Sequence, residues 1–142
     1  TRLPPARAQA LRAQAGLAVA FDTVASHALV PCTLDGAPVR LMFDTGGGHT
    51  LWVGVDGGPG DRVEYVSDAV GNVFPVFVGT GALGLGDAGS RVVPLARAPR
   101  FPYFADTVAA LGGNLHGLLG VSAFPGERLL FDGAEGRVYL LP

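Results

Sequence analysis

The chain has 142 residues, 49% of them hydrophobic, and a formal charge of −2 at pH 7, which indicates one folded globular domain with a sizeable core. The charge offers no basic surface for nucleic acid, and because all ten basic residues are arginines, lysine chemistry is excluded. The single cysteine, Cys32, excludes an internal disulfide and is expected to be a buried small hydrophobe, and no apolar run approaches the roughly 20 residues of a transmembrane segment.

The first 16 residues differ in composition from the rest. Residues 4–15 begin with Pro-Pro and continue with alanine, arginine, glutamine and leucine, and Gly16 follows them. Proline suits the start of a helix and glycine its end, so we expect a short helix or arm over 1–16, ahead of a single domain at 17–142. The chain does not begin with Met, which indicates that an upstream segment was removed. Export to the periplasm or out of the cell is one explanation.

From Leu17 onward, short apolar runs alternate with Gly, Pro, Asp and Ser, a pattern typical of an all-β domain. The predicted strands of the first half are residues 17–23, 27–34, 38–43 and 50–53. Residues 35–38, with the sequence Asp-Gly-Ala-Pro, predict the turn between the second and third of these strands. Residues 54–61 contain four glycines and a proline and predict a surface loop.

A hairpin is predicted for residues 62–70 and 73–78. The dipeptide between them, Gly71-Asn72, favours a tight primed turn. Pro75 cannot donate a hydrogen bond to a sheet, so one side of this hairpin is expected to be an exposed edge.

The next segment has the spacing of a dinucleotide-binding loop, at Gly79, Gly81 and Gly84. Such a loop needs a helix directly after it to hold the pyrophosphate. Here residues 87–90 predict a turn and residues 91–95 a strand, so nucleotide binding is not expected.

The last third of the chain predicts a loop, one helical turn and a final hairpin. The loop spans residues 97–103, with two prolines, and the helical turn spans 106–111. The final hairpin pairs residues 128–131 with 137–141 around a turn at 132–136.

One stretch of the β region carries a carboxylate in an unusual context. Its sequence is Leu41-Met42-Phe43-Asp44-Thr45-Gly46-Gly47-Gly48. The apolar residues predict a buried strand, so Asp44 stands at the end of a core strand, where a charge is costly unless it has a role. Glycines let another backbone or a substrate approach closely, and Thr45 can hold the turn by a hydrogen bond. An ordinary Asp-initiated turn is the alternative.

A second motif, Leu118-Leu119-Gly120, lies downstream. An apolar strand ending in Asp-Thr-Gly, followed by a later Leu-Leu-Gly, resembles the retropepsin-like aspartic peptidases of the pepsin superfamily, particularly the single-domain bacterial forms. The resemblance covers about residues 25–142. It implies an all-β, closed barrel with a flap hairpin.

The resemblance also implies residue roles. Asp44 is the expected catalytic aspartate, and the residues that would fix its position are Thr45, Gly46, Leu118, Leu119 and Gly120. The hairpin follows Asp-Thr-Gly at about the family's distance, so the resemblance implies a substrate-binding flap with Val70, Gly71 and Asn72 at its tip. An ordinary surface hairpin is the alternative. The chain departs from the family at Gly47, where Ala, Ser or Thr is usual.

A single Asp-Thr-Gly supplies half of the two-carboxylate site that this chemistry needs. The resemblance therefore implies a homodimeric endopeptidase, with Asp44 of each subunit at the two-fold axis, acting on a peptide or protein substrate without a cofactor or metal. Two alternatives stay open: a non-catalytic peptide-binding module of the same fold, and the peptidase half of a longer chain.

Other chemistries have weaker support in the sequence. Ser122 begins like a nucleophile elbow but lacks the second glycine and the strand-to-helix setting. His27, His49 and His116 show no metal-ligand spacing, and structural roles are expected for the latter two although they flank the motifs. Asp132 follows an apolar run as Asp44 does, but it lacks Thr-Gly and is expected to be a structural turn residue.

Overall fold

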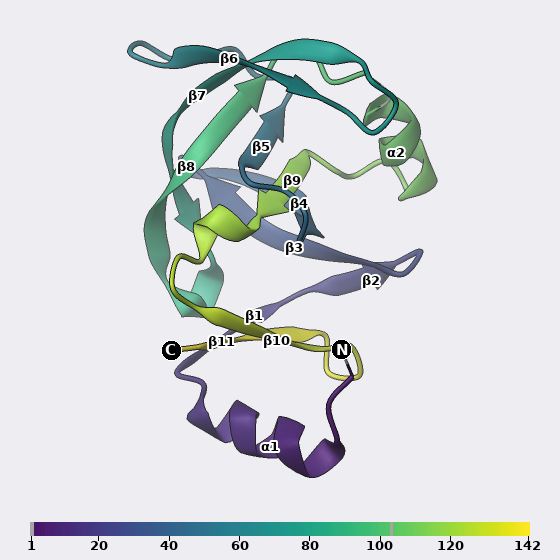
Figure 1. Cartoon of the computed structure of the whole chain (residues 1–142), viewed down its shortest axis with the longest axis vertical. Helices are drawn as coiled ribbons and strands as arrows, with labels where there is room; N and C mark the ends of the chain where they lie inside the picture. Colours follow the sequence, from purple (N-terminus) through teal and green to yellow (C-terminus); the bar gives the residue numbers. More distant parts are fainter. Residues whose placement is uncertain (1, 103) are drawn as a thin grey trace.

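The computed structural model describes residues 2–102 and 104–142, which are mostly β-structure (Figure 1). In chain order the elements are α1 (Pro5–Gln14), β1 (Leu17–Ala20), β2 (Asp22–Val24), β3 (His27–Leu34), β4 (Ala37–Asp44), β5 (Thr50–Val53), β6 (Arg62–Ser67), β7 (Val73–Gly84), η1 (Gly86–Ala88), β8 (Ser90–Ala98), α2 (Phe104–Ala110), β9 (Gly117–Gly120), η2 (Val121–Ala123), β10 (Arg128–Asp132) and β11 (Arg137–Leu141). The predicted N-terminal helix, the surface loop at 54–61 and the C-terminal hairpin are confirmed. The division into an arm and a domain at residue 16 stays a prediction.

The larger sheet has the order β2-β3-β4-β9-β5-β8-β7-β6, with β6 at one edge. An additional pairing joins β3 to β7, through Thr33 with Gly84 and Leu34 with Leu83. This pairing closes β3, β4, β9, β5, β8 and β7 into a ring, which agrees with the expected closed architecture. Leu34, Leu41, Leu95 and Leu119 lie in the core of the ring and are fully buried.

The smaller sheet has the order β1-β11-β10, and all its pairings are antiparallel. Helix α1 lies at this end of the molecule, far from the β6–β7 hairpin (Figure 1). Arg12 of this helix forms an ion pair with Asp132 of β10, with the two charged groups 2.7 Å apart. Leu11 is the buried residue of the helix.

Strand β9 lies between β4 and β5, parallel to the first and antiparallel to the second. Two of its glycines explain how it fits there. A Cβ on Gly117 would collide with the carbonyl oxygen of Leu51, and a Cβ on Gly120 with that of His49. Only glycine lets the three backbones approach this closely.

The predicted strand 17–23 is wrong as a single unit. It breaks at Phe21 into β1 and β2, which belong to different sheets. The buried Phe21 still donates its N–H to the carbonyl of Gly136 (2.9 Å), beside the smaller sheet, and from Asp22 onward the chain pairs with β3 of the larger sheet instead. A hydrophobic pattern along one segment does not reveal such a change of partner.

Three other boundaries differ from the prediction. Strand β7 continues through the glycine-rich segment to Gly84, because Gly81 provides room for the side chain of Leu95 on β8. Strand β8 includes Arg97 and Ala98, which were expected in a loop. The turn between β3 and β4 is only Asp35-Gly36, both with positive φ (49° and 83°).

Helix α2 begins at Phe104, two residues before the predicted helical turn. Within the described residues, neither helix is long and apolar enough to cross a membrane. Cys32 is half-buried beside the core of the ring, and burial raises the pKa of its thiol to about 12. The side chain is therefore a neutral packing group, as expected, although its burial is incomplete.

Candidate active site

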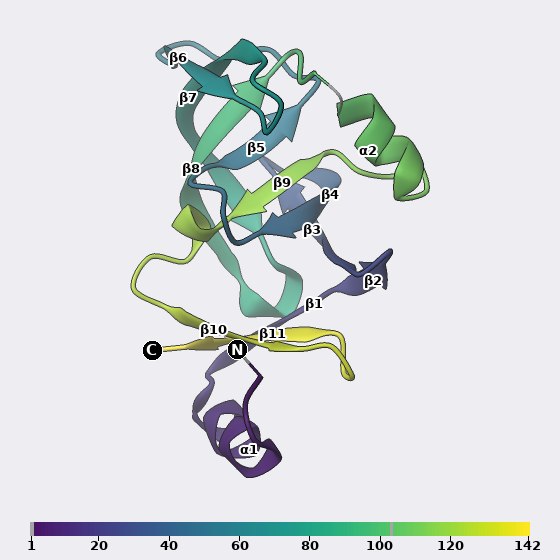
Figure 2. The ribbon, with the colours of Figure 1, turned by 45° about the vertical axis from the view of Figure 1, so that its right-hand side comes forward.

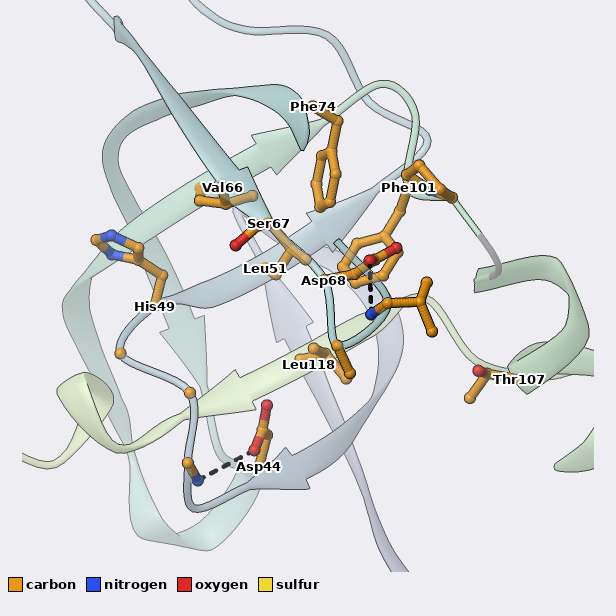
Figure 3. Close-up of a pocket in the computed structure, with 17 residues that line it drawn as sticks. Asp44, His49, Leu51, Val66, Ser67, Asp68, Phe74, Phe101, Thr107 and Leu118 are labelled. Atoms are coloured by element: carbon orange, nitrogen blue, oxygen red, sulfur yellow. Dashed lines mark hydrogen bonds between the residues drawn. The ribbon is translucent and has the colours of Figure 1, made fainter. Parts of the chain in front are cut away.

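Asp44 is the last residue of β4 and is aligned with Gly120 of β9. Its Oδ1 accepts a hydrogen bond from the backbone N–H of Gly46 (3.0 Å). Its Oδ2 receives no hydrogen bond from the described part of the chain. Figure 3 shows the carboxylate with one oxygen held by this turn and the other directed into a cavity.

Gly47 has a direct steric relation to this carboxylate. A Cβ at this position would lie 2.9 Å from Oδ2 and 3.2 Å from Cγ of Asp44. The first distance is shorter than real Cβ contacts and the second is tight, so the carboxylate would have to shift to make room for a larger residue at 47. The absence of a side chain at Gly47 is therefore linked to where this carboxylate lies.

The cavity beside Asp44 has a volume of about 530 Å³ and is lined by two groups of residues. The apolar group comes from several strands of the larger sheet and from the segment before α2; it includes Leu51, Val66, Phe74, Ala96, Phe101 and Leu118. The polar group includes Asp44, His49, Ser67, Asp68 and Thr107. Such a cavity, mainly apolar with a few polar groups, is typical of a ligand-binding site.

The loop that joins β6 to β7 lies across this cavity from Asp44 (Figure 3). It is the five-residue loop 68–72, so the predicted two-residue primed turn at Gly71-Asn72 is wrong. Asp68 organises the loop by accepting hydrogen bonds from Val70 N, Asn72 N and Asn72 Nδ2. The side-chain amide of Asn72, followed by these backbone N–H groups, holds the pKa of Asp68 below its ordinary value, although partial desolvation opposes the shift.

The residues expected to form the flap lie in different places. Val70 is exposed and lines the cavity together with Val66, Ser67, Asp68 and Ala69. Gly71 and Asn72 belong to the loop but do not line the cavity. The sequence analysis missed the role of Asp68. The signal was Asp68 followed by Gly71 and Asn72, because Asp, Gly and Asn are residues that favour loops.

The residues expected to support Asp44 are brought together around the end of β4. Leu118 lines the cavity, Leu119 is fully buried in the core, and Val121 N, just after Gly120, donates to the carbonyl of Gly47 (3.3 Å). Thr45 is exposed and makes no side-chain hydrogen bond within the described residues. The expected support of the turn by its hydroxyl is therefore absent from this single chain.

Thr50 provides a contact that the sequence reading missed. Its side chain is fully buried, and its Oγ1 accepts a hydrogen bond from the N–H of Gly120 (3.2 Å). The signal was a threonine directly after the glycine-rich turn, at the start of a strand. This bond fixes β9 against β5 and so helps to hold the backbone beside Asp44.

The histidines have separate environments. His49 lines the cavity, and its Nε2 lies 3.6 Å from a carboxylate oxygen of Glu64 on β6. Its buried Nδ1 has no hydrogen-bond partner among residues 2–102 and 104–142. His116 accepts a hydrogen bond from Arg40 N at Nδ1 (3.0 Å), and His27 is exposed. Among residues 2–102 and 104–142, no cluster of three or more His, Cys, Asp or Glu side chains could hold a metal ion.

Asp132 is the last residue of β10 and directly precedes the turn to β11. Its Oδ1 accepts hydrogen bonds from the N–H groups of Ala134 and Glu135, both at 3.1 Å, and its Oδ2 pairs with Arg12. These contacts agree with the structural role expected for it. The residue is not among those that line the cavity at Asp44.

Comparison with solved structures finds proteins of similar fold. No protein-family model and no curated protein matches the chain. The fold is similar to the crystal structure of a retropepsin-like aspartic protease from Rickettsia conorii, with a TM-score of 0.47 and 15% sequence identity over 87% of this chain and 88% of that one.

Proposed function

We propose that this chain is an aspartic endopeptidase that acts as a homodimer, with one Asp44 from each subunit in the active site. The observation that carries the proposal is the position of Asp44. Its carboxylate ends a strand of the larger sheet, has one oxygen free of hydrogen bonds within the described chain, and borders a cavity with the loop 68–72 on its far side. The cavity can hold an extended peptide between the carboxylate and this loop.

The proposed reaction needs two carboxylates that share one proton. The ionised carboxylate takes a proton from a water molecule, and that water attacks the carbonyl carbon of the scissile peptide bond. The protonated carboxylate donates a hydrogen bond to the carbonyl oxygen and polarises it. The C–N bond of the resulting tetrahedral intermediate then breaks as the leaving amine nitrogen takes a proton from the dyad. Two carboxylates at hydrogen-bonding distance hold one proton between them because repulsion prevents both from ionising.

The other carboxylates near the motifs are poor candidates for the second acid. Asp68 borders the same cavity, but its oxygens accept the hydrogen bonds that order the loop, and its lowered pKa keeps it ionised. Asp132 is paired with Arg12 outside the cavity. A second copy of Asp44 is therefore the simplest source, and the exposed Thr45 beside it is free to contact a partner subunit.

The loop 68–72 has the position of a flap in this proposal. With Val70 on the cavity side, next to Val66 of β6, it would cover the peptide and exclude water from the carboxylates during the reaction. Its ends are fixed, because the β6–β7 ladder is paired from Ser67 and Val73 onward. Motion of the loop is therefore expected to be local.

Subunit mixing tests both the catalytic residue and the dimer. Purified wild type and the Asp44→Asn variant would be mixed in varied ratios at a fixed total concentration, exchanged, and assayed with a fluorogenic peptide library. If each active site takes one Asp44 from each subunit, activity falls with the square of the wild-type fraction. A linear dependence on that fraction would mean that one chain holds a complete site, and retained activity in pure Asp44→Asn would remove Asp44 from the mechanism.

A dilution series provides the second test. Cleavage rate and sedimentation would be measured on the same samples, and specific activity should fall as the dimer dissociates. The pH dependence of the dimer should be bell-shaped on the acidic side of neutral, because coupled carboxylates titrate in two separated steps. Constant specific activity below the dissociation midpoint contradicts the homodimeric site.

A non-catalytic peptide-binding module is the second candidate, and the observation that favours it is Gly47. Because residue 47 has no side chain, no side-chain group at that position supports the Asp44 carboxylate, which lies over its own turn. A binding module would retain peptide affinity in wild type and in Asp44→Asn but would cleave nothing. The peptidase half of a longer chain is a variant of the main proposal. It predicts that the second aspartate comes from another segment and that mixing the longer chain with its Asp44→Asn form gives a linear dependence.

A further inference from the structure

A second hollow adjoins the cavity at Asp44. It has a volume of about 310 Å³ and is lined by Val73, Phe74, Pro75, Pro99, Arg100 and Pro102. Phe74 and Pro102 line both this hollow and the cavity at Asp44. The two spaces therefore share a wall, formed by the start of β7 and by the segment that leads to α2.

The shared wall is rigid. Phe74 is buried, and its ring lies 4.8 Å from that of Phe101, which lies 5.4 Å from Phe104 at the start of α2. Figure 2 shows the segment passing beside the β6–β7 hairpin on its way to α2. Pro99 and Pro102 restrict the backbone of this segment further, because proline fixes φ. A preformed groove loses little conformational freedom when it binds a ligand.

The chemistry of the hollow is apolar with one cation. Val73 is 67% exposed there, and the prolines present ring carbons but no N–H groups. A ligand is therefore recognised through its side chains, not by addition of a β-strand to these segments. Arg100 is exposed, and the ion pairs of the described residues engage other arginines, namely Arg12, Arg40, Arg62, Arg91 and Arg97. Its guanidinium is charged at any physiological pH.

We propose that this hollow, the Arg100 groove, is a distal subsite for the substrate polypeptide and that it takes an apolar side chain next to an acidic one. The inference rests on the proposed peptide-cleaving function and adds a preference outside the residues that touch the scissile bond. A peptide that leaves the Asp44 cavity over Phe74 and Pro102 meets the groove next. Its apolar side chain packs against Val73 and the prolines, and its carboxylate pairs with Arg100.

Peptide binding to the Asp44→Asn variant tests the subsite without requiring cleavage. The probes are fluorescein-labelled peptides with a Leu-Phe centre in an alanine background, carrying Leu-Glu at successive positions on either side of that centre. Each has a matched peptide with Leu-Gln in place of Leu-Glu. At one position, anisotropy should give about two- to fivefold tighter binding of the Leu-Glu peptide, the range expected for one exposed ion pair with correct geometry.

Substitutions then assign the preference to the groove. Arg100→Gln in the Asp44→Asn background should bind both peptides equally, and Arg100→Glu should favour a Leu-Arg peptide. Arg7→Gln, an equivalent charge change on the exposed part of α1 at the other end of the molecule, should leave the preference unchanged. Val73→Ser should weaken the Leu-Glu peptide about threefold, while Val92→Ser, at a valine that is 75% exposed on β8, should have no effect.

The outcomes separate the subsite from the proposed function. If wild type cleaves peptides in an Asp44-dependent manner but neither Arg100 nor Val73 affects any peptide, the peptidase stands and the subsite is wrong. If nothing is cleaved but binding to the Asp44→Asn chain depends on Arg100 as described, the subsite stands and the catalytic proposal fails. If no peptide of the series binds, the groove is not a subsite for such segments, whatever the cleavage assay gives.

Discussion

Two aspartates of this chain have similar sequence surroundings and different structural ones. Asp44 follows Leu-Met-Phe and Asp132 follows Leu-Leu-Phe, and each begins a turn that contains glycine. Each also accepts a hydrogen bond from the N–H two residues on, from Gly46 (3.0 Å) and from Ala134 (3.1 Å). The second oxygen differs: that of Asp132 pairs with Arg12, whereas that of Asp44 borders a cavity.

The strands that carry these aspartates also differ. Strand β4 lies inside the larger sheet between β3 and β9, whereas β10 is an edge strand that pairs only with β11. The short apolar run is thus the same local signal in two positions of the fold. Neighbours that are distant in sequence, Arg12 in one case and β9 in the other, determine which carboxylate is neutralised and which is available for chemistry.

The largest expected difference between the two regions is in activity. Asp44→Asn should lower kcat/KM about 10²- to 10⁴-fold, because an amide can neither accept the water proton nor share a proton with a second carboxylate. Asp132→Asn, with the same change of charge and shape, should retain wild-type kcat/KM at a protein concentration at which the dimer forms. Circular dichroism of both variants checks that the fold is intact. Equal losses in the two variants would contradict the distinction.

The glycines of the two regions should differ in stability. Gly120→Ala places a Cβ against the carbonyl carbon and oxygen of His49, which are backbone atoms and cannot move aside easily. The free energy of unfolding should fall by about 3 kcal/mol. Gly133, directly after Asp132, has open space around its missing Cβ and no positive φ, so Gly133→Ala should change stability by less than about 1 kcal/mol.

Urea denaturation of both glycine variants provides the measurement. Because both changes add one methyl group, differences in side-chain chemistry do not enter the comparison. A Gly120→Ala protein as stable as Gly133→Ala would mean that β9 is not held tightly between β4 and β5.

The third effect concerns the smaller sheet. Asp132→Ala removes two backbone hydrogen bonds and the partner of Arg12, and should reduce the free energy of unfolding by about 1–3 kcal/mol. Arg12→Gln removes only the ion pair, in which the arginine is partly exposed, and should cost about 1 kcal/mol or less. Thermal unfolding of the two variants separates turn formation from helix docking. A larger loss for Arg12→Gln than for Asp132→Ala would contradict this assignment.

Much of the fold could be predicted from sequence because its signals are local. Alternating apolar residues defined β3 and the C-terminal hairpin, and the Asp-Thr-Gly context identified Asp44 as a candidate. The prediction failed where the outcome depends on distant partners. The break at Phe21 depends on Gly136, and the extension of β7 depends on the fit of Gly81 against Leu95.

The candidate site divides in the same way. The residues around Asp44 could be predicted because they occur in two short motifs. The apolar walls could not, because Leu51, Phe74 and Phe101 come from separate elements and look like ordinary core residues in the sequence. The loop at 68–72 was read as a two-residue turn from Gly71-Asn72, but the hydrogen bonds of Asp68 favour a longer loop.

A smaller change at Gly47 tests how closely the Asp44 carboxylate is positioned. Gly47→Ala places a Cβ 2.9 Å from Oδ2, so the carboxylate must rotate away while the backbone can stay in place. Misplacement of the reacting group should lower kcat about tenfold with little change in KM. Gly46→Ala is a matched control, because its Cβ would lie 3.5 Å from Oδ1, an ordinary contact distance. A higher kcat in Gly47→Ala would mean instead that a side chain at this position supports the carboxylate.

The smallest expected effect is local and concerns Asp68. Like Asp44 and Asp132, this aspartate accepts a hydrogen bond from the backbone N–H two residues later, here that of Val70. Its folded pKa lies below the ordinary value of 3.8, so its contribution to loop stability is present above that pH and is lost as the pH falls through the lowered value. The loop 68–72 should therefore stay ordered over the mildly acidic range in which the proposed dyad works. Amide exchange at Val70 and Asn72 should accelerate only in stronger acid, beyond the intrinsic pH dependence of exchange.

Two variants test this assignment. Asp68→Asn should remove this acid-induced change, and Asp87→Asn, at an exposed aspartate of η1, should not. If the loop of the Asp68→Asn variant still opens in the same pH window, another group controls its opening. Asp68 would then not order its loop in the way that Asp132 orders its turn.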